Sequence, residues 1–302
     1  MTLISTSTSA FYDRATQDIS SLRARAEQMQ DQLGRGEKLS RSSDDPVAAS
    51  RLRVLARADR LSTIDTANAN RATSDLALAD SALSSFAEYV TRAQELTTQA
   101  ANGTLTGAQR ASIATELGQI HGNLVSLANS RDSAGHALFG GEAVGDAYDA
   151  AGAYIGTASA GSLDLGDGQA VARGLTGPEF LNFSVNGNPT DLMAVIRQLA
   201  TDLQGGAADP AQAARDALDA LGDGLDKVTT GQTLVGARLA WIDLTTERRI
   251  DLSEMRSGEE AEIGATDIAS TIANLQQLMT VLEASQASFS RLANLSLFDQ
   301  LR

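Results

Sequence analysis

The N-terminal part of the chain carries a narrow apolar stripe at helical spacing. Apolar residues recur at alternating intervals of three and four, and charged residues such as Arg23 and Glu27 fall between them. This period is typical of a coiled-coil seam, which is narrower than the buried face of a globular helix. The pattern predicts a helix that ends near Gly34 and Gly36. The stripe consists of Tyr12, Ala15, Ile19, Leu22, Ala26, Met29 and Leu33.

The C-terminal segment shows a second strong stripe. Because neither terminal stripe is wide enough to fold alone, each is expected to pack against the other or against copies from neighbouring subunits. This stripe consists of Ile268, Ile272, Leu275, Met279, Leu282, Gln286, Phe289 and Ala293. Beyond it come four large apolar residues, Leu295, Leu297, Phe298 and Leu301. Exposing them to water would cost ~25 cal/mol per Å², so a burial partner is expected.

Between the two ends the pattern predicts two long antiparallel helices. One begins at Asp44-Asp45-Pro46, where Asp is a good N-cap and Pro suits the first helical position. It meets no glycine before Gly103, which gives a helix roughly 80 Å long at ~1.5 Å per residue. Its later half carries the stripe Leu76, Ala79, Leu83, Phe86, Val90 and Ala93. The next helix is expected to keep Ile113, Leu117, Ile120, Leu124, Leu127, Ala134 and Leu138 in register.

The middle of the chain is rich in glycine and loses the helical period. Leu163 and Leu165 alternate with polar residues before Gly166-Asp167-Gly168, which predicts a short β-hairpin. A turn follows at residues 186–189, and helix returns from Asp191 to Leu203. Helix then dominates from Pro210 to the end, with an expected interruption at Ser257-Gly258 and a seam formed by Leu234, Ala237, Trp241, Leu244 and Met255.

The expected fold is therefore mainly α. It is an elongated rod of long antiparallel helices with terminal coiled-coil helices and a small β-hairpin element in the middle. Residues 1–40 and 260–302 form a terminal assembly domain, 41–140 and 190–259 a helical rod, and 141–189 the glycine-rich β-element. The assembly domain is expected to be disordered in the monomer, because a seam without its partner cannot offset the entropy of ordering.

Composition narrows the range of functions. A formal net charge of −14 disfavours nucleic acids and anionic membranes as partners. No apolar run approaches the ~20 residues that span a bilayer, so membrane insertion is not expected. The N-terminus lacks the basic and apolar regions of a cleavable secretory signal. The absence of cysteine excludes disulfides and thiolate metal sites, and it is compatible with export in an unfolded state.

Candidate chemistry is sparse. His121 and His136 are the only histidines, and no H-x-x-x-H or H-E-x-x-H spacing accompanies them, so both are interpreted as ordinary helix-face residues. Asp164 and Asp167 lack the ligand spacing of a calcium loop and are interpreted as turn residues. The sequence thus predicts no catalytic residue, no metal site and no cofactor.

Five motifs in order resemble the bacterial flagellin family. The stretch from Leu39 to Leu52 is similar to the N-terminal signature of the family, and its Asp-Asp-Pro form is closer to the hook-associated members than to filament flagellins. Asn102-Gly-Thr104 and the helix after it resemble the second conserved stretch. Leu138-Phe-Gly-Gly141 also resembles the hook-associated members. Gly166-Asp-Gly168 with Leu175-Thr-Gly177 is similar to their small β-element. The runs from Leu282 to Arg291 and from Leu295 to Phe298 resemble their C-terminal end.

The resemblance implies a structural subunit that joins the flagellar hook to the filament and is not an enzyme. It implies self-association in a ring or helical assembly, with a hook-associated protein and flagellin as neighbours. It also implies uncleaved export through the flagellar type III apparatus, with a cytoplasmic chaperone on the C-terminal helix. The residues expected at the assembly interface are Tyr12, Ile19, Leu22, Met29, Leu33, Asp44, Asp45, Pro46, Leu275, Leu282, Phe289, Leu295, Leu297, Phe298 and Leu301.

Two alternatives stay open at this point. The terminal Leu301-Arg302 is common in filament flagellins, which share the packing mechanism and differ in copy number. A coiled-coil signalling or chaperone-type binding module is a further alternative. It predicts terminal helices that are stable in the free monomer, and hydrogen exchange would distinguish it.

Overall fold

The computed structural model describes residues 3–185 and 187–300, and the side chains of residues 10–185 and 187–291. Contacts divide the chain into a smaller unit of residues 1–60 and 252–302 and a larger unit of residues 61–251. Two 55-residue helices, α2 (Pro46–Ala100) and α6 (Pro210–Gly264), belong partly to each. The expected mainly α fold with a small β-element is confirmed. The division into three domains stays a prediction.

The smaller unit pairs the two ends of the chain. Helices α1 (Leu3–Arg35) and α7 (Ile268–Gln300) are antiparallel, and their inner ends are joined by backbone hydrogen bonds. The amide of Thr266 donates to the carbonyl of Gly36 at 2.9 Å, and that of Lys38 donates to Gly264 at 2.7 Å. Gly36 has φ +73°, which a residue without a Cβ adopts freely, so the chain can turn there from α1 toward α2.

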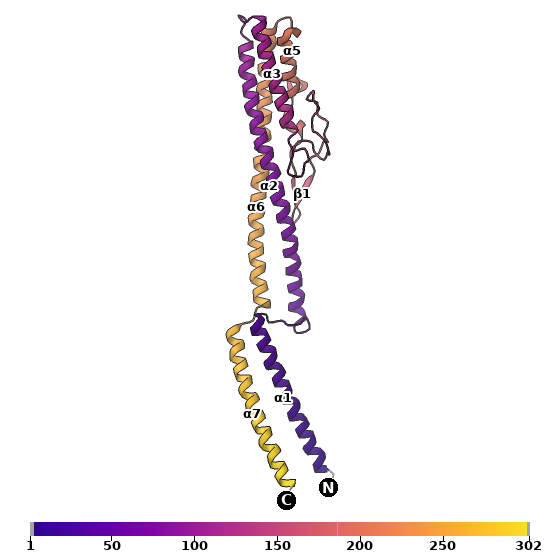
Figure 1. Cartoon of the computed structure of the whole chain (residues 1–302), viewed down its shortest axis with the longest axis vertical. Helices are drawn as coiled ribbons and strands as arrows, with labels where there is room; N and C mark the ends of the chain where they lie inside the picture. The colour runs from indigo at the N-terminus through magenta and orange to yellow at the C-terminus, as the bar shows by residue number, and fades with distance from the viewer. Residues whose placement is uncertain (1–2, 186, 301–302) are drawn as a thin grey trace. The chain divides into compact units, whose positions relative to one another are not determined.

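In the larger unit, α2 and α6 lie side by side with α3 (Gly107–Ala128) and α5 (Leu192–Thr201) beside them (Figure 1). The buried residues of α2 recur every three or four positions between Ala69 and Ala100, and they include the predicted stripe from Leu76 to Ala93. One continuous apolar core joins these four helices to the loop that follows α3. The packing face of α2 in this unit is therefore the one that the periodicity of the sequence predicts.

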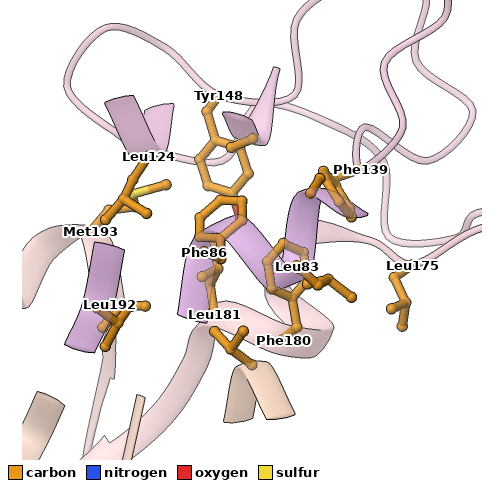
Figure 2. Packing of buried hydrophobic residues seen from close by; sticks show 14 of the residues in the cluster. Leu83, Phe86, Leu124, Phe139, Tyr148, Leu175, Phe180, Leu181, Leu192 and Met193 are labelled. Carbon is orange, nitrogen blue, oxygen red and sulfur yellow. The ribbon is translucent and has the colours of Figure 1, made fainter. Parts of the chain in front are cut away.

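Three phenylalanines hold the loop onto the helices (Figure 2). Phe86 comes from α2, Phe139 from the loop after α3, and Phe180 from the short helix α4 (Gly177–Leu181). All three are fully buried, and their ring centroids are 4.8 to 6.4 Å apart. Contacts of this kind contribute beyond their buried area. The glycine-rich middle is thus anchored to the core rather than separate from it.

Two hairpins follow the loop. The predicted hairpin is present as β1 (Ser162–Gly166) and β2 (Gln169–Ala172), paired antiparallel. Its turn places both Gly166 (φ +86°) and Asp167 (φ +53°) in the left-handed region. The sequence indicated only a turn where β3 (Asn182–Val185) pairs with β4 (Asn188–Asp191). The short π-helical segment η1 (Asp202–Gly206) ends the predicted 191–203 helix.

The third helix is shorter than expected. It ends at Ala128, so Ala134 and Leu138 lie in the loop and not in its register. Asn129 is the C-cap residue of α3, with φ −97° and ψ 12°. Its side-chain oxygen accepts hydrogen bonds from the amides of Ala147 and Tyr148 at 2.8 and 2.9 Å and so holds the following loop against the end of the helix.

The predicted seam of α6 was wrong. Trp241, Leu244 and Met255 are 41%, 57% and 71% exposed. The helix also continues through Ser257-Gly258 without interruption, since one glycine costs only about 1 kcal/mol in a helix. The face that packs in the larger unit contains small and β-branched residues, which let the helices approach closely. It includes Ala214, Leu221, Gly224, Val228, Gly231, Val235 and Ile242.

Candidate assembly interface

The predicted N-terminal stripe is the covered face of α1. All seven of its residues are buried or half-buried, and Ala26 is 4% exposed. Every other residue between Tyr12 and Gln30 is exposed. A face this narrow matches a two-helix seam and leaves no second layer in contact with α1 within the described part of the unit.

Helix α7 supplies the other side of the seam. Leu275 and Phe289 are half-buried and Leu282 is 7% exposed, so these three predicted residues face α1. The prediction that Ile268, Ile272 and Met279 share this seam was wrong, because they are 58%, 42% and 37% exposed. The apolar surface of α7 is therefore wider than α1 covers. An α-helix advances 100° per residue, so an apolar run of this length spreads beyond one contact line.

Aromatic side chains from the two ends of the chain meet in this seam. The rings of Tyr12 and Phe289 lie 5.6 Å apart at 88°, an edge-to-face arrangement. Phe11 lies 5.9 Å from Tyr12 and is 52% exposed. The structure thus brings together residues that were chosen separately from the two terminal patterns.

The signature at the start of α2 has a local structural role. One carboxylate oxygen of Asp44 accepts hydrogen bonds from the amides of Ser40 (3.2 Å) and Arg41 (2.8 Å) and folds the preceding loop. Asp45 accepts from Val47 and Ala48 and so caps α2, whose first residue is Pro46. That Asp44, Asp45 and Pro46 also contact a partner stays a prediction.

The last four predicted interface residues lie at or beyond the end of the described residues. The backbone of Leu295, Leu297 and Phe298 belongs to α7, but their side chains lie outside the described residues. Leu301 lies wholly outside them.

Charged groups fix the ends of the helices in this unit. The carboxylate of Asp267 accepts hydrogen bonds from the amides of Ser270 (3.3 Å) and Ala269 (3.1 Å), which lower its pKa and cap α7. Two ion pairs join α2 to α6: Arg51 to Glu259 at 2.7 Å and Arg256 to Asp59 at 2.8 Å. Hydrogen bonding to Arg51 lowers the pKa of Glu259.

The larger unit contains a polar cavity of about 340 Å³. Asp75, Asp132, His136 and Arg173 line it. Burial raises the pKa of Asp75, whose oxygen is 3.9 Å from the Arg173 guanidinium. Burial opposes ionisation of Asp132, yet the backbone amides of His136 and Ala134 lower its pKa. These contacts fasten the loop to α2. No group of three or more ligating residues suited to a metal occurs among the described residues.

The two histidines were interpreted as helix-face residues and the two aspartates as turn residues, and the position of His136 contradicts the first of these interpretations. His121 lies on α3 and is 9% exposed, whereas His136 lies in the loop 3.4 Å from Asp132 and not on a helix. Asp164 accepts a hydrogen bond from the amide of Gly166 at 2.8 Å, as a turn residue does. No helix within residues 3–185 and 187–300 has the length and apolar character of a membrane span.

The sequence and the fold of this chain are similar to those of known flagellar proteins. Residues 4–143 match the family model of the bacterial flagellin N-terminal helical region, and this match spans α1, α2 and α3. Flagellar hook-associated protein 3 of Escherichia coli is 28% identical over 97% of this chain and 98% of its own length. This chain is similar to bacterial flagellins over residues 4–143 and to hook-associated protein 3 over nearly its whole length. The resemblance stated from its motifs is confirmed.

Other similar proteins extend the comparison. Flagellar hook-associated protein 3 of Salmonella typhimurium is 27% identical over 97% of this chain and 98% of that protein. Among solved structures, a flagellar hook-associated protein from Vibrio parahaemolyticus has a TM-score of 0.66 and 23% identity, covering 74% of this chain and 100% of that one. Hook-associated protein 3 of Legionella pneumophila has a TM-score of 0.62 and 14% identity, covering 70% and 98%. At these identities the structures support the fold.

Proposed function

We propose that this chain is a structural subunit of the flagellin family that joins the flagellar hook to the filament, and that it is not an enzyme. The observation that carries the proposal is the match over 97% of the chain to two proteins named flagellar hook-associated protein 3. A match of that extent includes both terminal helices, which hold the assembly residues, as well as the core of the larger unit. It favours the junction over the filament as the place of action.

The mechanism is packing of the terminal helices. The seam of α1 and α7 covers one face of each helix, but α7 still exposes Ile272, Met279 and Val281 at 37 to 45%. Such a set of exposed apolar residues on one helix favours burial against further helices. Neighbouring copies in a ring or helical assembly supply those helices, with a hook-associated protein on one side and flagellin on the other.

The same exposed residues of α7 also need a partner before the protein is exported and assembled. Before export, a cytoplasmic chaperone covers the apolar surface of the C-terminal helix, as an amphipathic helix is held in a groove. The protein leaves the cell through the flagellar type III apparatus without a cleavable signal. Residues 1–40 and 260–302 are disordered in the free monomer and become helical on assembly, when the ordering entropy is offset by burial.

Deleting the gene tests the proposal. We expect cells with intact hooks, few attached filaments and flagellin released into the medium, and a plasmid copy of the gene restores attachment. A filament flagellin would behave differently, because its loss leaves no flagellin to be released. Filaments that stay attached in the deletion strain would contradict the proposal.

A truncated copy tests the role of the C-terminal tail. Removal of residues 295–302 should abolish filament attachment, because the large apolar residues of the tail lose their place in the assembly. The larger unit, residues 61–251, contains none of the removed residues, so its thermal unfolding should stay unchanged. If the truncated protein still joined hooks to filaments, the proposed role of the tail would be wrong.

A further inference from the structure

The parts of α2 and α6 that belong to the smaller unit carry opposite charges. Residues 46–60 of α2 contain four arginines and one aspartate, a net charge of +3. Residues 252–264 of α6 contain four glutamates and one arginine, a net charge of −3. Pairing within the chain uses only part of this charge, namely Arg51 with Glu259 and Asp59 with Arg256.

The remaining charges have no partner within the described part of the chain. Arg57 and Arg60 on α2 and Glu254 and Glu262 on α6 are exposed and make no ion pair there. Arg53 is also exposed, and its side chain reaches only the backbone carbonyl of Ala49. We call Arg53, Arg57 and Arg60 the basic edge and Glu254 and Glu262 the acidic edge.

Helix geometry directs the centres of these two edges away from each other within one chain. Leu55 is 3% exposed on α2, and Arg57 lies two residues, or about 200°, further around that helix. On α6, Arg256 reaches across to Asp59, and Glu254 lies about 200° from it. Arg57 and Glu254 therefore point outward, each away from the other helix of the pair.

Apolar side chains accompany both edges. Val47 and Val54 beside the basic edge are 79% and 55% exposed, and Met255 beside the acidic edge is 71% exposed. Exposed apolar residues next to unpaired charges are typical of a contact surface with a polar rim. The two surfaces are opposite in charge, and each has an apolar component.

We propose that the basic edge of one copy docks against the acidic edge of the next copy in the assembly. This inference rests on the proposed function, because it names the lateral contact between assembled copies. A contact that uses two different surfaces of the same chain is heterologous, and such contacts close into rings or continue as helices. The opposite charges determine that the basic edge meets the acidic edge of the next copy, and Val47, Val54 and Met255 supply the apolar contact.

Charge reversal in trans tests the contact. One variant carries Arg57→Glu and Arg60→Glu, and a second carries Glu254→Arg and Glu262→Arg. Each is expressed alone in the deletion strain, then both together, and attached filaments per cell are counted. Either variant alone places like charges at every contact, so we expect at least a tenfold loss of attached filaments. A variant with all four reversals should attach filaments as the wild type does.

Expressing the two charge-reversed variants together should restore the contact that each variant alone disrupts. Where the two variants alternate in an assembly, one contact joins the reversed edges and the next joins the unchanged edges, so every contact between unlike variants again pairs opposite charges. We expect filament attachment to return close to the wild-type number. The variant Glu88→Arg, which reverses an exposed charge of α2 outside both edges, should attach filaments normally when expressed alone.

Two results would overturn the inference. One is normal attachment by either reversed variant alone, and the other is failure of the mixture and of the fourfold variant to restore attachment. In both cases the wild-type gene still restores the deletion strain if the proposed function holds. Failure of the wild-type gene itself would instead count against the function.

Discussion

Gly231 offers a test of how closely α6 packs in the larger unit. A Cβ at this position would lie 2.9 Å from the Cβ of Phe180 and 3.8 Å from a methyl group of Leu83. The Phe180 Cβ is fixed to the backbone of α4, so it cannot rotate away as the end of a long side chain does. The change Gly231→Ala must therefore shift α4 or α6 itself.

Two opposing effects determine how much Gly231→Ala changes the free energy of unfolding. Alanine is more favourable than glycine in a helix interior by about 1 kcal/mol. Overpacking a close-packed core costs about 1–3 kcal/mol. The net expectation for Gly231→Ala is a loss of about 0–2 kcal/mol in the free energy of unfolding. Gly236 lies in the same helix, is exposed and has no atom within 4 Å of its would-be Cβ, so Gly236→Ala should gain about 1 kcal/mol.

Urea and thermal unfolding, followed by circular dichroism, would compare the two variants with the wild type. The account predicts that Gly236→Ala raises the unfolding midpoint and Gly231→Ala does not. If both substitutions stabilised the chain to the same extent, α6 would not approach Phe180 as closely as described, and the reasoning would fail.

Three further predictions concern the loop, the buried histidine and the terminal seam. Phe139→Ala should lower the free energy of unfolding by about 3–5 kcal/mol, because it removes a fully buried ring that packs on Phe180; a loss below about 1 kcal/mol in urea unfolding would argue against that packing. Burial, and then the charge of Arg197, lower the pKa of His121 in the folded chain. The unfolded chain therefore binds the proton more readily, so this contribution to stability is complete above about pH 6.5 and is lost as pH falls. Melting temperatures between pH 5 and 7 should show a shallower slope in His121→Gln, and an unchanged slope would exclude the histidine as the cause. Leu282→Gln, in the seam, should abolish filament attachment, whereas Val281→Gln beside it should weaken attachment less; equal effects would contradict the orientation of α7.

The α1 side of the terminal seam could be predicted because its apolar residues recur at a regular spacing. From Tyr12 to Met29 the residues between the covered ones are exposed and almost all polar, so only one face is available for packing. The start of α2 could also be predicted, because a capping residue, Asp45, is followed directly by Pro46, which suits the first turn of a helix. Local chemistry of this kind does not depend on distant parts of the chain.

The packing face of α6 could not be read in the same way. Leu234, Trp241 and Leu244 form a stripe of large apolar residues that is exposed. The buried face has an aliphatic residue at every seventh position from Leu221 to Ile242, but between them lie Gly224 and Gly231, which contribute no hydrophobic signal although Leu192 and Phe180 approach them. Contacts with residues about 30 to 50 positions away decide this face, and a periodicity argument does not include them.

The second hairpin was missed for a related reason. Its strands are four residues long, Pro189 lies in one of them, and their burial pattern has no fully buried position. Sequence patterns of that length do not separate a strand from a turn. The lateral contact was also beyond a sequence argument, because it depends on which charges remain unpaired after α2 and α6 have folded together.

Localisation of the protein tests the central claim most directly. The chain has no cysteine, and Val144 lies on a loop with 90% of its surface exposed, so Val144→Cys provides one site for a fluorescent maleimide. On intact flagella the account predicts a single spot at the end of each hook, where the filament begins. Label distributed along the whole filament would contradict a junction role and identify a filament subunit.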